Sequence, residues 1–334
     1  MPRIQFAIIG CGHAAAIHAA QIKRFGQLAA VCDVDSSKGK VFAEKHGAEF
    51  YPDLKQLLKQ EPALDVVVIC TPNGLHCQQA IAVMRAGFHV LVEKPMALNL
   101  RDANKMIRVA KETGRQLFTV MQNRFNPPVV AVRKLLQGNR LGAIYTIQLN
   151  CFWNRNAAYY KDSWHGTKEL DGGILFTQFS HFIDLLIWLF GPVKQVKSIL
   201  KNTAHRREIA FEDAGIVLFE WKNGMIGAMN YTINAFEKNR EGSLTILGEK
   251  GMVKIGGEYL NTLQHQAISK YTIKYKEAVA DANDYGTYQG SMRNHNKVYE
   301  SLIGTLKKNK PYYTSPEEAR TTIQLIEQIM QPTK

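Results

Sequence analysis

Two short stretches place ionisable side chains where the surrounding pattern is apolar. Glu93 and Lys94 follow an apolar run that ends at Val92, and a charged pair at that point is not what core packing selects. His181 and Asp184 stand three residues apart in an apolar segment, so a helix there would bring them to one face. Lysine and histidine can both handle a proton in a reaction. A lone histidine on an apolar helix is more often a core residue, so the pattern alone leaves its role open.

A third stretch has the spacing of a nucleotide-binding turn. The apolar run 4–9 leads into Gly10-Cys-Gly12-His-Ala-Ala15, which fits G-x-G-x-x-G/A. Gly10 permits a tight turn, Gly12 lets backbone amides approach a pyrophosphate, and Ala15 lets the following helix pack on the sheet. Asp33 lies 21 residues after Gly12, where an acidic side chain meets the adenosine ribose. We therefore expect a dinucleotide to be held by Gly10, Gly12, His13, Ala14 and Asp33.

The residues after Asp33 indicate which dinucleotide binds. A carboxylate accepts hydrogen bonds from a free ribose diol, whereas a 2′-phosphate would be repelled by it and would want a cation nearby. The first cation after Asp33 is Lys38. The sequence therefore favours NAD over NADP.

Other polar residues follow the ends of predicted parallel strands. The carboxyl ends of such strands line the ligand crevice of an open sheet, so these residues are expected to face the cofactor. For His76 a plain helix-start role is equally compatible with the pattern. Pro95 makes a cis peptide bond after Lys94 plausible. The predicted cofactor contacts of this group are Thr71, Asn73, His76, Glu93, Lys94 and Gln122.

The order of predicted elements gives an α/β protein with two domains. Strands alternate with helices up to residue 121, which predicts an N-terminal doubly wound parallel sheet of the Rossmann type over 1–122. The remainder, 123–334, reads as an α+β domain with an open, mainly antiparallel sheet, because its strands have short connections such as Lys222-Asn223-Gly224. Its six predicted strands cover 144–152, 193–202, 214–221, 225–233, 244–247 and 252–255.

Three further helices and the free face of the predicted antiparallel sheet bear on the architecture and the state of assembly. Capping patterns predict helix starts after Asn99 and Ser315, and an apolar face predicts one helix through 174–186. The free face of an open sheet can be buried against another subunit. We therefore expect a homo-oligomer, either a dimer or a tetramer.

Composition excludes several other classes. The 334 residues carry 42 Lys and Arg against 29 Asp and Glu, yet the cations are dispersed and no nucleic-acid-binding motif is found. Solvated faces or an anionic small substrate explain this balance. No apolar run approaches membrane-spanning length and no signal-peptide pattern begins the chain, so we expect a cytoplasmic protein without membrane contact. The five cysteines lack metal-ligand spacing, and no metal is implied.

The connection between residues 153 and 191 is the least ordinary part of the second domain. It holds two aromatic clusters among glycines and polar residues, which are costly to expose. Stacking on a sugar or base explains them, and so does a loop that packs on its own domain. The candidates for holding a substrate here are Arg155, Tyr160, Trp164 and Lys168.

Taken in order, the motifs G-x-G-x-x-A, T-P-N-x-x-H, E-K-P, D-G-G and H-F-I-D resemble those of the glucose-fructose oxidoreductase/inositol dehydrogenase (Gfo/Idh/MocA) family across nearly the whole chain. The resemblance implies that Lys94 and His181 meet beside the nicotinamide as the catalytic pair, and Asp184 is then a candidate for orienting His181. Many family members carry Asp four residues before this histidine. This chain has Thr177 followed by Gln178, which leaves the proton route to His181 and Lys94 and makes Thr177 and Gln178 substrate-contact candidates.

A narrower resemblance concerns the substrate. The segments Y-Y-K-D-S-W-H-G-T and D-G-G-I-L-F-T-Q-F-S-H are similar to those of the UDP-N-acetylglucosaminuronate 3-dehydrogenases of bacterial surface-polysaccharide biosynthesis, including lipopolysaccharide. The resemblance implies hydride transfer from a sugar carbinol carbon to NAD. His181 is the preferred base and Lys94 the stabiliser of the developing alkoxide, with the reverse assignment left open. A dehydrogenase of a free sugar or polyol, or a non-catalytic NAD-binding sensor, are the alternatives.

Overall fold

The computed structural model describes residues 3–275, 282–284 and 289–331, and these form two compact units. The first unit comprises Met1–Met121 and His295–Ile323, and the second comprises Gln122–Asn294 and Gln324–Lys334. The predicted division between 122 and 123 lies one residue from the first of these boundaries. Residues His295–Ile323 group with the first unit, although the sequence analysis places all of 123–334 in the second domain.

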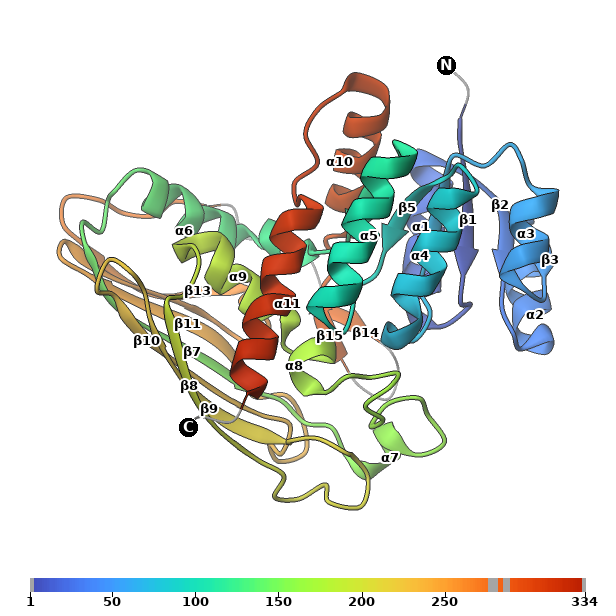
Figure 1. The fold of residues 1–334 in the computed structure, drawn as a ribbon. Helices are drawn as coiled ribbons and strands as arrows, with labels where there is room; N and C mark the ends of the chain where they lie inside the picture. Colours follow the sequence, from blue (N-terminus) through green and yellow to red (C-terminus); the bar gives the residue numbers. More distant parts are fainter. Residues whose placement is uncertain (1–2, 276–281, 285–288, 332–334) are drawn as a thin grey trace. The chain divides into compact units, whose positions relative to one another are not determined.

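A six-stranded parallel sheet in the order β3-β2-β1-β4-β5-β6 forms the centre of the first unit (Figure 1). The order reverses between β1 and β4, and ligands bind at such a reversal, beyond the carboxyl ends of the strands. The sheet thus confirms the predicted Rossmann architecture. Its strands are β1 (Ile4–Ile9), β2 (Gly26–Cys32), β3 (Glu49–Tyr51), β4 (Val66–Ile69), β5 (His89–Val92) and β6 (Leu117–Thr119).

Three helices of this unit begin at a residue whose side chain caps them. Asn99 accepts a hydrogen bond from the Asp102 amide at 2.8 Å, and Asp35 and Asp53 cap two shorter helices in the same way. Helix α10 packs against α1, which brings a segment nearly 300 residues into the chain beside the first helix. The helices are α1 (His13–Phe25), α2 (Ser36–His46), α3 (Leu54–Gln60), η1 (Asn73–Leu75), α4 (His76–Arg85), α5 (Leu100–Thr113) and α10 (His295–Lys308).

The second unit is built on a seven-stranded sheet in the order β13-β12-β11-β7-β10-β9-β8. Its neighbouring strands pair antiparallel except β7 and β10, which are parallel, so the prediction of an open, mainly antiparallel sheet is confirmed. The strands are β7 (Ile144–Phe152), β8 (Gln195–Lys201), β9 (Ala214–Glu220), β10 (Ile226–Thr232), β11 (Glu241–Gly248), β12 (Gly251–Gly256) and β13 (Thr262–Ile268), with a separate pair β14 (Ala282–Asp284) and β15 (Gln289–Met292).

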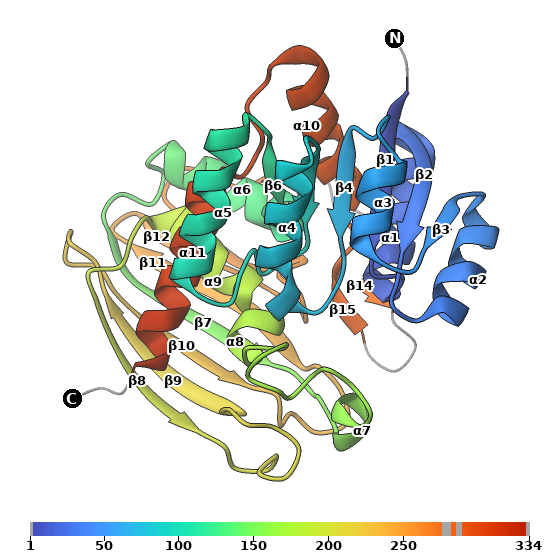
Figure 2. The ribbon, with the colours of Figure 1, turned by 45° about the vertical axis from the view of Figure 1, so that its right-hand side comes forward.

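One face of this sheet carries helices α6 and α9 (Figures 1 and 2). The helix predicted over 174–186 is two helices, α8 and α9, interrupted at Gln178 and Phe179. Residue 179 has backbone angles of −108° and 0°, outside the helical range, and this ends the first turn before α9 begins. The helices of this unit are η2 (Gln122–Phe125), α6 (Pro127–Gln137), α7 (Ala157–Tyr160), α8 (Ile174–Thr177) and α9 (Ser180–Phe190), and α11 (Pro316–Met330) spans the division between the units.

The opposite face of the sheet exposes a row of aliphatic side chains. The pairing register aligns Ile199 with Ile216, and Leu218 with Ala228 on the next strand, so these side chains share one face. More than half of the surface of Ile199, Ile216, Leu218 and Ile226 is exposed. We call these four residues and Leu247 the open sheet face.

Candidate functional site

The loop after β1 has the geometry that a dinucleotide requires. Gly10 has a φ of +84°, and a β-carbon there would lie 2.8 Å from the Cys70 carbonyl oxygen, so the tight turn depends on glycine. A β-carbon at Gly12, by contrast, would meet no atom within 4 Å. Gly12 therefore keeps an open space at the N-terminus of α1, where a pyrophosphate binds in this kind of turn.

Asp33 is tied to the same loop. One carboxylate oxygen accepts a hydrogen bond from the Cys11 amide at 2.7 Å, and the other accepts from the Asp35 amide at 2.9 Å. Each oxygen keeps a further lone pair, so the group can still accept the two hydroxyls of a ribose. The residues thus fit NAD, and when bound this cofactor supplies the hydride acceptor of an oxidation.

The strand ends after β4 and β5 are joined through His76. Its fully buried ring contacts the Pro95 carbonyl at 2.7 Å through Nδ1 and the Thr71 carbonyl at 3.0 Å through Nε2. Burial lowers the pKa of His76, although the two carbonyls oppose this shift. The ring therefore links two loops of the crevice, and direct contact of His76 with the cofactor stays a prediction.

Glu93 and Lys94 form the turn after β5. The Glu93 carboxylate accepts a hydrogen bond from the Lys94 backbone amide at 3.1 Å, and the Lys94–Pro95 peptide is cis, as the sequence suggests. The second oxygen of Glu93 contacts His18 at 2.8 Å. His18 was not among the predicted site residues, although its place on the buried side of α1, behind the glycine turn, could have indicated it.

His181 lies in α9, where only 2% of it is exposed. Asp184, one turn further on, forms a two-pronged salt bridge with Arg124, whose Nε and terminal nitrogen lie 2.8 and 2.7 Å from the two carboxylate oxygens. Both partners are buried, and the guanidinium also lies over the Trp188 ring. Arg124 was not among the predicted site residues. The role of Asp184 in orienting His181 stays a prediction.

Thr177 lies against a carboxylate. Its hydroxyl donates to the Asp171 carboxylate and lies 3.2 Å from the Asp171 carbonyl oxygen, while the fully buried carboxylate also accepts the Gly166 amide at 2.8 Å. The position that many family members fill with Asp therefore has a carboxylate beside it, supplied by Asp171 from the preceding turn. Gln178 donates to the Tyr159 hydroxyl at 3.1 Å. This bond links the break between α8 and α9 to the segment 153–168, which we call the aromatic loop.

The aromatic loop divides into an inner and an outer part. Tyr160 is buried, and burial raises the pKa of its hydroxyl, which makes ionisation of this residue unfavourable. The outer part is a stack in which the His165 ring lies 4.3 Å from Tyr159 and 3.8 Å from Trp164. Tyr159, which was not among the predicted site residues, takes part in the stack, and the Tyr160 ring packs edge-on against it at 4.9 Å. Contact of Tyr160 with a substrate stays a prediction.

The two predicted cations of this loop differ in exposure. Arg155 is 4% exposed and lies between the Trp153 and Tyr159 rings, 5.2 and 5.3 Å from their centroids. It also donates to Asn239 at 3.2 Å. Lys168 is exposed. Arg155 thus supports the Tyr159 side of the stack, whereas Lys168 is accessible to an anionic ligand.

The remaining predicted cofactor residues lie as follows. His13 begins α1 and is exposed, Ala14 follows it, and Asn73 is buried in η1. Gln122 donates to the Ser291 hydroxyl at 3.0 Å.

No helix in the described part of the chain is long and apolar enough to cross a membrane.

Comparison with known proteins matches both parts of the chain to one family. Residues 4–121 match the oxidoreductase family with an NAD-binding Rossmann fold, GFO_IDH_MocA, and residues 133–333 match its C-terminal alpha/beta domain. The WlbA dehydrogenase from Chromobacterium violaceum, solved with NADH and UDP-GlcNAcA, is 36% identical with a TM-score of 0.88, over 98% of this chain and 94% of that chain. The WlbA dehydrogenase from Bordetella pertussis, solved with the same ligands, is 34% identical with a TM-score of 0.87, over 98% and 95%. A myo-inositol 2-dehydrogenase of Thermotoga maritima is 24% identical over 75% of this chain and 74% of its own length.

Proposed function

This chain belongs to the Gfo/Idh/MocA family of oxidoreductases, and from that premise we propose that it oxidises the 3-hydroxyl of UDP-GlcNAcA to the 3-oxo sugar, with NAD as hydride acceptor. Its first unit is an NAD-binding Rossmann domain, and the chain is an NAD-dependent sugar dehydrogenase. The identity of the substrate, a nucleotide sugar, and the position of its oxidation, the 3-hydroxyl, are what we propose here.

One observation carries the choice of substrate. Two dehydrogenases solved with UDP-GlcNAcA resemble this chain over 98% of its length at 36% and 34% identity. The similarity to the myo-inositol 2-dehydrogenase is weaker, at 24% identity over three quarters of the chain. The stack of Tyr159, Trp164 and His165 offers flat apolar surfaces of the kind that sugars and bases contact.

In the proposed mechanism, His181 takes the proton of the 3-hydroxyl while the hydride leaves the same carbon for the cofactor. The unperturbed pKa of histidine lies near neutrality, which suits a general base at physiological pH. Lys94 donates a hydrogen bond to the same oxygen and stabilises the negative charge that develops on it. Asp184, held by Arg124, orients His181 from the next turn of α9, and Lys168 attracts the anionic part of the substrate.

The test is the absorbance of NADH at 340 nm when enzyme and NAD are mixed with UDP-GlcNAcA, UDP-N-acetylglucosamine, glucose or myo-inositol. We expect turnover with the uronate and little with the other three. Faster turnover of free glucose or inositol would contradict the nucleotide-sugar assignment. NAD binding without turnover of any of these compounds would instead favour a sensor.

We further propose that the chain acts as a cytoplasmic homo-oligomer in the synthesis of surface polysaccharide. Support for self-association comes from the open sheet face, because contiguous exposed aliphatic side chains are a feature of protein interfaces. A second copy of the same face would be self-complementary about a two-fold axis.

A further inference from the structure

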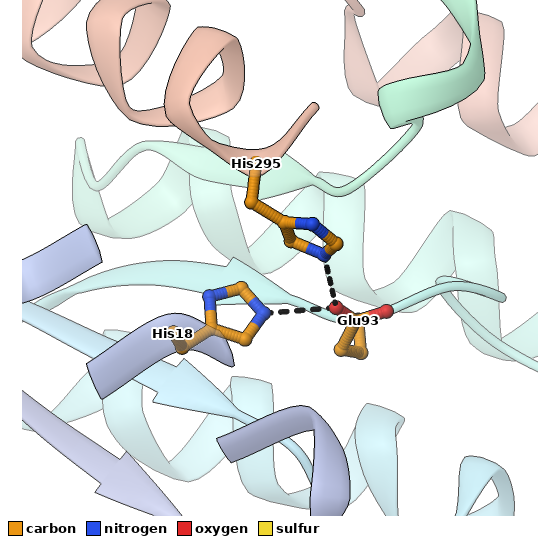
Figure 3. Close-up of side chains that lie close together, drawn as sticks. All are labelled: His18, Glu93 and His295. Carbon is orange, nitrogen blue, oxygen red and sulfur yellow. Dashed lines mark hydrogen bonds and ion pairs between the residues drawn. The ribbon is translucent and has the colours of Figure 1, made fainter. Parts of the chain in front are cut away.

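Three ionisable side chains from distant parts of the chain meet inside the first unit (Figure 3). His18 comes from α1, Glu93 follows β5, and His295 begins α10. One Glu93 oxygen lies 2.8 Å from Nε2 of His18 and 3.6 Å from Nε2 of His295. The two histidine side chains are at most 4% exposed and that of Glu93 is 13% exposed. We call these three residues the His–Glu–His cluster.

Tyr299 fixes the proton of His18. Its hydroxyl lies 2.9 Å from Nδ1 of His18, and burial raises the pKa of the tyrosine well above its ordinary value, so the hydroxyl keeps its proton and donates. Burial lowers the pKa of His18 despite the opposing effect of Glu93. The ring is therefore neutral and carries one N–H. Because Nδ1 accepts, that N–H is on Nε2 and points at Glu93.

Glu93 therefore stays a carboxylate. Burial alone would raise its pKa, but the interactions of the carboxylate with His18 and His295, led by the hydrogen bond from His18, outweigh burial and hold the pKa well below the usual value. Its other oxygen accepts the Lys94 amide at 3.1 Å. Hydrogen bonds thus join Tyr299 to His18, His18 to the Glu93 carboxylate, and Glu93 to the backbone amide of Lys94.

Tyr299, at the far end of this chain of contacts, is closely packed. The Tyr299 ring is fully buried and packs against Phe6 and Phe25, with ring centroids 5.7 and 6.1 Å away. His18 and His295 also meet edge to face at 5.4 Å. Movement of the Glu93 side chain would leave the N–H of His18 buried without an acceptor, which is unfavourable.

The same three residue types could hold a divalent metal, but the geometry favours a proton. Two nitrogen or oxygen ligands about 2.1 Å from a tetrahedral zinc lie roughly 3.4 Å apart. The 2.8 Å between His18 and Glu93 is instead an ordinary hydrogen-bond length. Tyr299 as donor to Nδ1 also places the proton on Nε2, the nitrogen that a metal would need.

We propose that His18 and His295 are positioning residues that hold the Glu93 carboxylate against the backbone of Lys94 and so fix the direction in which Lys94 is presented. The inference rests on the proposed role of Lys94 in the reaction. The two histidines act on Lys94 through Glu93, so they are positioning residues and not catalytic ones.

The kinetic test compares two substitutions of His18. In His18→Gln the side-chain amide can still donate to Glu93, whereas His18→Leu cannot. We expect His18→Leu to lower kcat by about 10-fold to 100-fold with a change in NADH affinity of less than about threefold, and His18→Gln to recover most of the loss, because misplacement of a reacting group costs about this much. His46→Gln, in α2 of the same unit, serves as the control. Equal kcat in both His18 variants, or a parallel loss of NADH affinity, would overturn the proposal.

A second readout does not depend on activity. In ¹⁵N-histidine NMR spectra of the full chain, we expect His18 as the Nε2–H tautomer, unchanged by added Co²⁺. An Nδ1–H tautomer, or a cobalt absorption band that disappears in His18→Leu, would overturn the positioning role in favour of a metal site. If no sugar is turned over but the tautomer is as expected, the proposed function fails while the geometry of the cluster stands.

Discussion

At the scale of single residues, the assignment of the base depends on His181. We predict that His181→Asn lowers kcat by at least about 100-fold, since general-base catalysis contributes of that order. NADH affinity should stay within about threefold of the wild type, because the cofactor residues of the first unit are untouched. Stopped-flow turnover and fluorescence titration with NADH measure the two quantities separately. Equal losses in both would show that His181 supports binding and is not the base.

Glu212 gives a pH-dependent prediction away from the reaction. Burial raises the pKa of its carboxyl to about 7, and Tyr231 donates to it at 3.3 Å. The folded state therefore holds a proton that the unfolded state releases near pH 4.5, so the free energy of unfolding should fall as the pH rises from 4.5 to 7 and level off above. The difference between a pKa of 4.5 and one of about 7 corresponds to about 3 kcal/mol in the free energy of unfolding. Urea unfolding of Glu212→Gln at pH 5 and pH 8 should lack this part of the decrease, and an unchanged pH dependence would refute it.

At the scale of elements, the two glycines of the turn after β1 have different roles: Gly10 is needed for the fold and Gly12 for cofactor binding. Gly10→Ala should destabilise the fold by about 1–3 kcal/mol, because alanine would be strained at a φ of +84° and its methyl group would meet the Cys70 carbonyl. Gly12→Ala should leave stability unchanged, since the methyl group meets no protein atom, but should weaken NADH binding by at least about tenfold. Thermal unfolding and NADH titration of both variants check this. Normal NADH affinity in a stable Gly12→Ala would show that the pyrophosphate does not lie there.

The elements of the first unit were predictable because each carries a local signal. Buried parallel strands are continuously apolar, and the helix starts at Asn99 and Ser315 have the expected caps, with Ser315 and Glu318 bonded reciprocally. Strand β13 was not predicted, because it is a mostly exposed edge strand without an apolar run. The Arg124–Asp184 pair and the His–Glu–His cluster were also missed. Their partners lie 60 to about 280 residues apart, so only the fold brings them together.

At the scale of the whole molecule, the open sheet face decides the state of assembly. We predict that the double substitution Ile216→Lys and Leu218→Lys lowers the molar mass in solution to that of a monomer, because a dimer interface would have to bury four added charges across its two copies. Size-exclusion chromatography with light scattering measures this. Val41→Lys, at another exposed aliphatic residue, in α2, is the control. A monomeric wild type, or a mutant with unchanged mass, would rule out this face as the interface.

The reaction itself is tested most directly by following one hydrogen. UDP-GlcNAcA labelled with deuterium at carbon 3 is mixed with enzyme and unlabelled NAD, and the cofactor is analysed by mass spectrometry. The proposed hydride transfer predicts reduced cofactor that carries one deuterium, together with a 3-oxo sugar. Reduced cofactor without deuterium would place the oxidation at another carbon, and the absence of reduced cofactor would contradict the assignment of UDP-GlcNAcA as substrate.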